Sequence, residues 1–223
     1  MGEAQEELWK DNLQFFGKAT ASISHEVKNI LAIIGQSAGL LEDMVFMSEK
    51  GKELKTERLK QISALIQKQT LQADHVIRRL NSFSHSSDEA VKTIDILDTV
   101  KMVLSLAERS ASLKGVELGL KHSVENLSIT TDPFSLENLL WRCLDFAINK
   151  SDDKGSLLVD VAEYEGGGKV EISGIGNSPS GAVEEFPGPK ESIIAEHLRA
   201  SLSVRNREGS LLIGLPRNIV SQG

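Results

Sequence analysis

The spacing of apolar residues changes near residue 86 of the chain. From about Asp11 to His85 there is no proline, and apolar positions recur at alternating steps of three and four residues. The first series contains Phe16, Thr20, Ile23, Val27, Ile30, Ile34, Leu41 and Met44, and the second contains Leu59, Ile62, Ile66, Gln69, Ala73, Val76, Leu80 and Phe83. This period of about 3.5 residues predicts two bundled helices that share a narrow apolar seam.

A charged stretch with one glycine separates the two series. It runs from Ser48 to Thr56, contains Gly51 and predicts a helix–helix connection. Each helix would be roughly 40–50 Å long at 1.5 Å per residue. Two helices of that length bury their apolar sides poorly as an isolated hairpin. We therefore expect a helical hairpin domain over residues 1–86 that pairs with a second copy into a dimeric four-helix bundle.

The second half, expected as a domain over residues 92–223, mixes both spacings after a linker at residues 86–92. Asp132 before Pro133 predicts a helix N-terminus. Helices are expected at 94–114, 133–148 and 192–200, and strands at 116–121, 156–164, 169–175, 202–206 and 210–215, with a glycine-rich turn at 165–168. Interleaved helices and antiparallel hairpins are typical of an α+β layered domain. The predicted fold class is therefore an α-helical hairpin followed by an α/β sandwich.

His25 lies on the polar side of the first helix. At 100° per residue, Ile23, Val27, Ile30 and Ile34 fall roughly 140–200° from it. Its own face carries Ser22, Asn29, Ala32 and Gln36, which are small or polar. The imidazole is therefore expected to point away from the seam.

An exposed histidine beside an acid has two interpretations. A neutral imidazole has an unprotonated nitrogen that is nucleophilic near pH 7. Glu26 is close enough to hold the proton of the other nitrogen and stabilise the cation formed on attack. Asn29, one turn later, could orient a water or a phosphoryl oxygen. The spacing alone favours the second interpretation, a solvated surface histidine.

The motif Ser24-His25-Glu26-Val27-Lys28-Asn29 resembles the H-box of bacterial sensor histidine kinases. The family's proline after the asparagine is replaced by Ile30. The resemblance implies that His25 is a phosphoacceptor, that Glu26 is its general base, and that Asn29 assists hydrolysis of a partner's phosphoaspartate. It also implies a dimeric four-helix bundle.

The resemblance continues to about residue 216. The start of the family's ATP-binding domain is similar to residues 94–98 and 114–118 of this chain. Its nucleotide-site helix is similar to residues 131–148, and its closing elements are similar to residues 194–198 and 212–216.

Three positions that the family uses to hold nucleotide are changed. Phe146 stands where the family has an asparagine for Mg²⁺, and a phenyl ring offers no ligand to that cation. The family's Asp-x-Gly-x-Gly motif is similar to residues 174–178, where Gly174 has no acceptor for adenine and only Gly176 is kept. In the stretch 180–192 that replaces the glycine-rich lid, Pro187 and Pro189 each lack an amide donor. We expect no bound cofactor.

Asp145 and Asn149 leave residual nucleotide binding open, because a shifted helix register would bring either near the metal position. Gly166 to Gly168 are interpreted as a turn. Of the other candidates, His75, His85, His122 and His197 have no convincing metal-ligand spacing, and Cys143, Trp141 and Trp9 are expected to be packing residues. No metal site is predicted.

Composition narrows the classes of function. The 32 acidic and 25 basic residues give a net charge of −7, and 4% aromatic content disfavours base stacking, so nucleic acid is not an expected partner. The sequence contains no run of about 18 apolar residues, so we expect no membrane span. One cysteine and a polar N-terminus fit a cytoplasmic location.

These observations together predict a histidine phosphotransferase of a bacterial phosphorelay. It would carry a phosphoryl group on His25 between receiver-domain aspartates without ATP, with Mg²⁺ supplied by the receiver. The alternatives are a sensor histidine kinase core with divergent nucleotide contacts, a non-catalytic dimeric scaffold, and a phosphatase that uses Asn29. The expected partners are receiver domains of response regulators and a second copy of the chain.

Overall fold

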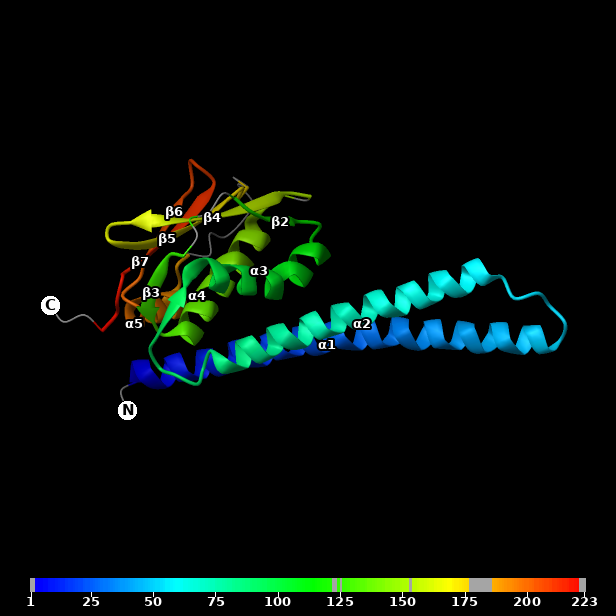
Figure 1. Ribbon diagram of the computed structural model, residues 1–223. Coiled ribbons are helices and arrows are strands. Elements are labelled where there is room, and N and C mark those ends of the chain that lie inside the picture. The colour runs from blue at the N-terminus through cyan, green and yellow to red at the C-terminus, as the bar shows by residue number, and fades with distance from the viewer. Residues whose placement is uncertain (1–2, 122–123, 125, 153, 177–185, 221–223) are drawn as a thin grey trace. The chain divides into compact units, whose positions relative to one another are not determined.

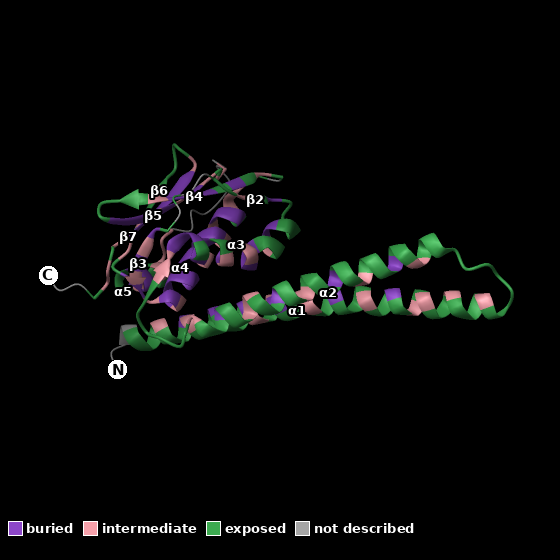
Figure 2. Cartoon of the chain, viewed as in Figure 1, coloured by how far each residue is buried: buried purple, intermediate pink, exposed green. Residues whose placement is uncertain are grey.

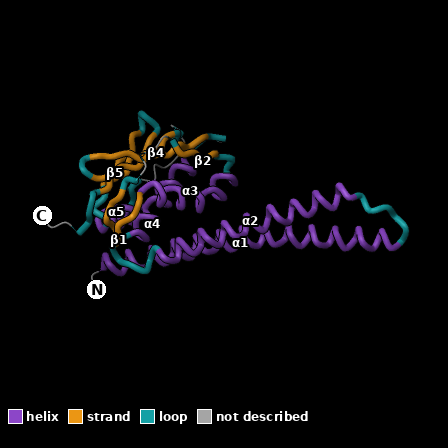
Figure 3. Tube along the Cα trace, viewed as in Figure 1, coloured by secondary structure: helices purple, strands orange, loops and turns teal. Residues whose placement is uncertain are grey.

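The computed structural model describes residues 3–121, 124, 126–152, 154–176 and 186–220, with backbone alone for residues 3 and 4. Within this part of the chain there are five helices and seven strands (Figure 3). Contacts divide the chain into two compact units, Lys18–Ser84 and the combination of Met1–Gly17 with His85–Gly223. Each unit is considered by itself below.

Two long helices form the first unit, as the apolar spacing predicts. Helix α1 spans Glu3–Glu49 and helix α2 spans Thr56–His85, joined by residues 50–55. Gly51 adopts a φ of 85°, and its N–H donates to the carbonyl of Ser48 at 2.9 Å. The end of α1 is thus closed by a residue that tolerates the left-handed conformation.

The seam of the hairpin has a seven-residue repeat. The buried residues of the first unit are Ala19, Ile23, Ile30 and Ser37 on α1, and Ile62, Gln69, Val76 and Phe83 on α2 (Figure 2). This confirms the predicted period of 3.5. The predicted series is off by one residue at its start, because Phe15 is buried whereas Phe16 is 37% exposed.

One 18-residue window within α1 has a mean hydropathy of 1.5 and is 11% buried. We expected no such segment, because the sequence contains no unbroken apolar run of that length. By length and composition this helix alone, among the described residues, would suffice to cross a membrane, a test that core helices of soluble proteins also pass.

The second unit is built on a mixed five-stranded sheet in the order β2-β4-β5-β7-β6. Its strands are β2 (Glu117–Leu120), β4 (Ser156–Tyr164), β5 (Gly167–Ser173), β6 (Ser201–Arg205) and β7 (Ser210–Leu215). Strands β2 and β4 are parallel, and the other neighbours are antiparallel. Strands β1 (Lys92–Asp95) and β3 (Ser128–Thr131) form a separate antiparallel pair.

The described residues of this unit also contain three whole helices: α3 (Ile96–Leu113), α4 (Pro133–Lys150) and α5 (Pro189–His197). Helices α3 and α4 lie side by side on one face of the sheet (Figure 1). Inward residues of β4, such as Leu157, Val159 and Val161, join them in one apolar core. The predicted N-cap is confirmed, since the Asp132 carboxylate accepts the Ser135 N–H at 3.1 Å.

Several local predictions are wrong. Residues 92–95 form strand β1 rather than the end of a linker and the start of a helix, and β3 was not predicted. Gly167 and Gly168 belong to β5 and not to the turn. A side chain at Gly168 would overlap Ile96, and one at Gly167 would overlap the Leu215 carbonyl, so close packing requires both glycines.

The first turns of α1 belong to the second unit, which the sequence did not reveal. Phe15 is 1% exposed, with its ring centroid 5.5 Å from that of Phe134 and 5.7 Å from that of Trp141. Trp9, expected to pack, is 66% exposed. Residues 3–17 therefore cover part of α4.

Candidate functional site

The His25 side chain is exposed on α1, as predicted. No hydrogen bond or ion pair joins it to another residue of the described part of the chain. Relative to the buried Ile30, His25 lies about 140° around the helix. The imidazole is therefore accessible to a docking partner.

Glu26, the expected general base, bonds to the other helix of the hairpin. Its Oε2 accepts from the Arg79 guanidinium at 2.7 Å, and the Arg79 side chain is only 11% exposed. Glu26 follows His25 in the sequence, but Arg79 holds its carboxylate. No hydrogen bond joins Glu26 to His25 in this structure. Spacing could not reveal Arg79, which lies 53 residues away.

Asn29 is exposed one turn beyond His25. It lies about 40° around α1 from His25, so the imidazole and the amide share one face of the helix. The structure thus places two of the three predicted residues on one accessible face and ties the third to α2.

In the second unit, Phe146 packs against the chain that leads into α5. Its ring stacks on that of Phe186 with a centroid distance of 4.2 Å and an interplanar angle of 16°. Both side chains are half-buried against the core. An apolar stack therefore stands at the position where the family resemblance implies a metal ligand.

The backbone at Gly174 excludes the aspartate that the resembled motif carries there. Its φ is 95°, and a Cβ at this position would overlap the carbonyl oxygen of Ser156. The N–H groups of Gly174 and Ile175 both donate to the carbonyl of Gly209, at 3.1 and 2.9 Å. At Gly176, a Cβ would lie 2.9 Å from the Asp152 carboxylate. This strand end is held against neighbouring backbone.

A buried polar cluster connects α1 to α4 and α5. Asp11, whose side chain is 4% exposed, accepts from Lys190 at 2.9 Å and lies 3.6 Å from Arg142. Arg142 also donates to Glu191 at 3.0 Å. At the next position of α1, the Asn12 side-chain amide donates to the Ser135 hydroxyl at 3.1 Å, and its Oδ1 accepts from the Asn138 side-chain amide at 2.8 Å.

A second polar cluster surrounds the start of α4. The Nε2 atom of His197 lies 2.8 Å from Oδ2 of Asp132. This hydrogen bond raises the pKa of His197. Burial alone would raise the pKa of Asp132, but hydrogen bonds from His197 and Ser135 lower it overall.

Glu137, on the second turn of α4, accepts from the Ser86 hydroxyl at 2.8 Å. Burial raises the pKa of Glu137 to about 8, and the nearby Asp132 charge adds to this effect. A carboxyl group in this state is mostly protonated at pH 7.

The remaining candidates are distributed as follows. Asp145 is half-buried and Asn149 is exposed, while Cys143 is fully buried, and burial raises the pKa of its thiol. Residues 177–178 of the changed motif, residues 180–185 of the lid stretch, and His122 lie outside the described residues. Within the described part of the chain, no group of three or more His, Cys, Asp or Glu residues could hold a metal ion.

No protein-family model and no curated protein matches the chain. Solved structures of histidine kinases do match it. The ThkA catalytic domain is 15% identical in sequence, and the match covers 58% of this chain and 99% of the ThkA domain. The Acinetobacter baumannii kinase AdeS is 16% identical, and the match covers 86% of this chain and 98% of the AdeS chain. ThkA in complex with the response regulator TrrA has 17% identity over 97% and 67%, and all three TM-scores are 0.47.

Proposed function

We propose that this chain is a histidine phosphotransferase of a two-component system. It would accept a phosphoryl group on His25 from the aspartyl phosphate of a receiver domain and pass it to a second receiver. The proposal rests on the H-box resemblance of residues 24–29 together with the observation that carries it, the exposed and unpaired imidazole of His25.

The transfer needs few groups from this chain. The P–O bond to the receiver aspartate breaks as a P–N bond to the imidazole forms, and the aspartate leaves as a carboxylate. Such a loose transition state depends mainly on positioning and charge neutralisation. His25 supplies the nucleophile, Asn29 a polar group on the same face, and the receiver the Mg²⁺.

Glu26 would hold the ring proton of His25 and stabilise the cation formed on transfer. In this structure Arg79 holds the carboxylate instead. A rotation of the Glu26 side chain away from Arg79 would therefore accompany transfer.

Two features of the second unit support a reaction without ATP. The Phe146–Phe186 stack fills space at the implied metal position, and hydrocarbon rings do not ligate Mg²⁺. The backbone around Gly174 leaves no room for an acidic side chain that would read adenine. We propose that this unit provides a surface for docking of the receiver domain and does not bind nucleotide.

The proposed homodimer would form along an outer stripe of α1, made up of Val27, Leu31, Ile34, Leu41 and Val45. Leu31 and Val45 are 57% and 53% exposed. The stripe lies roughly 20–100° around the helix from Ile30, on the side opposite to His25. A partner on this stripe would complete a four-helix bundle and leave His25 free.

The test is phosphotransfer without ATP. Receiver domains labelled on aspartate with ³²P are incubated with the full chain and Mg²⁺. We expect acid-labile, base-stable label on the wild-type chain and none on His25→Ala. His75→Ala, which removes an exposed histidine of α2 outside the motif, is the matched control and should still accept label.

The other outcomes would each support a different function. Label from [γ-³²P]ATP on His25 would show a histidine kinase core and overturn the proposal. Receiver dephosphorylation that requires Asn29 but leaves no label on His25 would indicate a phosphatase. Biological activity that survives His25→Ala would indicate a scaffold.

A further inference from the structure

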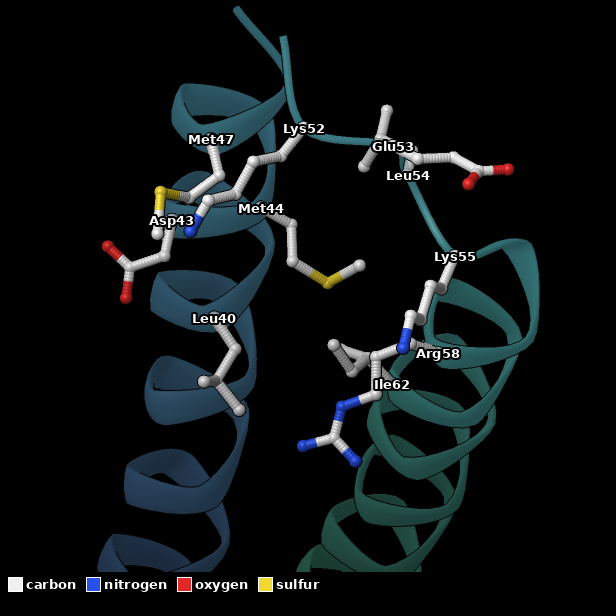
Figure 4. A pocket seen from close by; sticks show the side chains of 10 residues that line it. All are labelled: Leu40, Asp43, Met44, Met47, Lys52, Glu53, Leu54, Lys55, Arg58 and Ile62. Carbon is white, nitrogen blue, oxygen red and sulfur yellow. The ribbon is translucent and has the colours of Figure 1, made fainter. Parts of the chain in front are cut away.

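A pocket opens between α1 and α2 near the loop that joins them (Figure 4). Its volume is about 270 Å³. The walls are mostly apolar, made by Leu40, Met44 and Met47 of α1, Leu54 of the loop and Ile62 of α2. The side chains of Leu40, Met44 and Ile62 point into the gap between the helices.

Three cations lie around this pocket. Lys52 and Lys55 come from the loop and Arg58 from α2. The acids that line the same pocket, Asp43 and Glu53, direct their carboxylates away from the gap (Figure 4). No ion pair joins the three cations to a carboxylate of any described residue, in a chain whose net charge is −7.

The placement of two of these cations is not explained by helix stability. Lys55 and Arg58 flank the start of α2, where the helix macrodipole disfavours positive charge. By comparison, the nearby Lys60 pairs with Glu57 at 3.8 Å. Lys55 and Arg58 are therefore available to neutralise an anion held at the pocket.

A second copy of the chain is not the expected occupant. Viewed along α1, three of the pocket residues lie roughly 40–100° from Ile30, on the side of Ile30 where His25 also lies; they are Leu40, Met44 and Met47. The outer stripe lies on the other side of Ile30. A partner helix on the stripe would leave the pocket open.

We infer that this pocket binds a small amphipathic anion. Its apolar chain or ring would lie between Leu40, Met44 and Ile62, and its carboxylate or similar head group would contact Lys55 and Arg58. Ligand pockets commonly combine apolar walls with a few charged groups that fix orientation. The methionines suit such a ligand because their flexible side chains adapt to its shape.

Methionine methyl groups report directly on this site. The full chain is labelled with ¹³C-methyl methionine and titrated with decanoate below its micelle-forming concentration. We expect saturable shifts of the Met44 and Met47 signals, while Met102, which lies on α3, stays unchanged. 1-Decanol, which has the same chain without the charge, should bind at least tenfold more weakly.

Variants separate the charge from the walls. Arg58→Ala and Lys55→Ala should each weaken decanoate binding several-fold, and Leu54→Ser should weaken decanoate and decanol alike. Lys60→Ala is the matched control, because Lys60 is a cation of α2 that does not line the pocket, and it should bind decanoate normally.

Equal binding of decanol and decanoate, no effect of Arg58→Ala and Lys55→Ala, or equal shifts at Met102 would each overturn the inference. A change of the Met44 and Met47 signals with protein concentration in the absence of decanoate would also overturn it if the change persists in Leu31→Glu with Val45→Glu, since a second copy would then occupy the pocket and not the outer stripe. The titration is repeated with His25→Ala, so its result is independent of phosphotransfer.

Discussion

Asp11 is a single carboxylate that serves two cations from different elements. Lys190 belongs to α5 and Arg142 to α4, while Asp11 itself lies on α1. With a side chain that is 4% exposed, it has little access to water as a substitute partner. Its removal would leave Arg142 with Glu191 and Asn138, and Lys190 without its carboxylate.

Asp11→Ala should therefore lower the free energy of unfolding of the second unit by about 1.5–3 kcal/mol, the range for hydrogen bonds to a charged group, because Arg142 keeps Glu191 and Lys190 reaches water. Urea unfolding followed by the fluorescence of Trp9 and Trp141 measures this change. Glu6→Ala removes an exposed acid of the same helix and should change stability by less than about 0.5 kcal/mol. A loss for Asp11→Ala no larger than that control would contradict the assignment.

Glu137 should make the stability of the second unit depend on pH. Its folded pKa of about 8 lies above its ordinary value of 4.5, so the folded state holds a proton that the unfolded state releases. Its contribution is complete below pH 4.5 and is lost as the pH rises toward 8, with a slope of at most about 1.4 kcal/mol per pH unit.

Glu137→Gln should remove that slope and leave the unit more stable than the wild type at pH 8. Urea titrations at several pH values between 4.5 and 9 provide the measurement. The raised pKa of His197 gives a separate loss at higher pH, which His197→Gln removes and Glu137→Gln does not. Parallel pH profiles for wild type and Glu137→Gln would disprove the buried-carboxyl explanation.

The hairpin seam contains a polar layer. Ser37 and Gln69 are buried, and in the register set by the Glu26–Arg79 pair they lie at about the same level. The Ser37 hydroxyl donates to the carbonyl of Ile33, but the buried Oε1 of Gln69 has no hydrogen-bond partner among the described residues. A buried acceptor without a donor costs about 1–3 kcal/mol.

Gln69→Leu should consequently stabilise the hairpin by about 1–2 kcal/mol, because it replaces the unsatisfied amide with an apolar side chain of similar size. Thermal unfolding followed by circular dichroism would detect a higher Tm. Gln67→Leu, at an exposed position of α2, should leave the Tm nearly unchanged. If both variants behave alike, the polar layer is not the cause.

The long and strongly patterned elements could be predicted from the sequence, and the short ones could not. The heptads fixed both helices of the hairpin, and Asp132 with Pro133 fixed the start of α4. Strand β1 has only four residues, two of them exposed, so its pairing with β3 leaves no periodic signal.

The same division holds for the candidate site. The exposure of His25 follows from the angular position of its neighbours, which is local. The Glu26–Arg79 pair, the Phe146–Phe186 stack and the Asp11 cluster join residues 40 to 179 positions apart, and only the folded chain brings them together. Phe15 is an example, because its ring packs against Phe134 and Trp141 of α4, whereas the helical spacing alone predicted Phe16 as the buried position.

For the whole chain, the proposed dimer gives a direct test. Leu31→Glu with Val45→Glu places two charges on the outer stripe and should convert the dimer to a monomer, measured by light scattering over a range of concentrations. Leu71→Glu, at a site that is 73% exposed on α2 and outside the stripe, should leave the dimer intact. A wild-type chain that is monomeric at high concentration would refute the dimer itself.

Helix α1 supplies its first turns to one compact unit and its remainder to the other. Cleavage of the chain near residue 86 would therefore not separate two self-sufficient pieces, because the C-terminal piece would lose the helix that covers Phe134 and Trp141. That piece would then be able to bind the first turns of α1 when they are supplied as a separate molecule. A synthetic peptide of residues 3–17, added in trans, would restore its native fluorescence by fragment complementation.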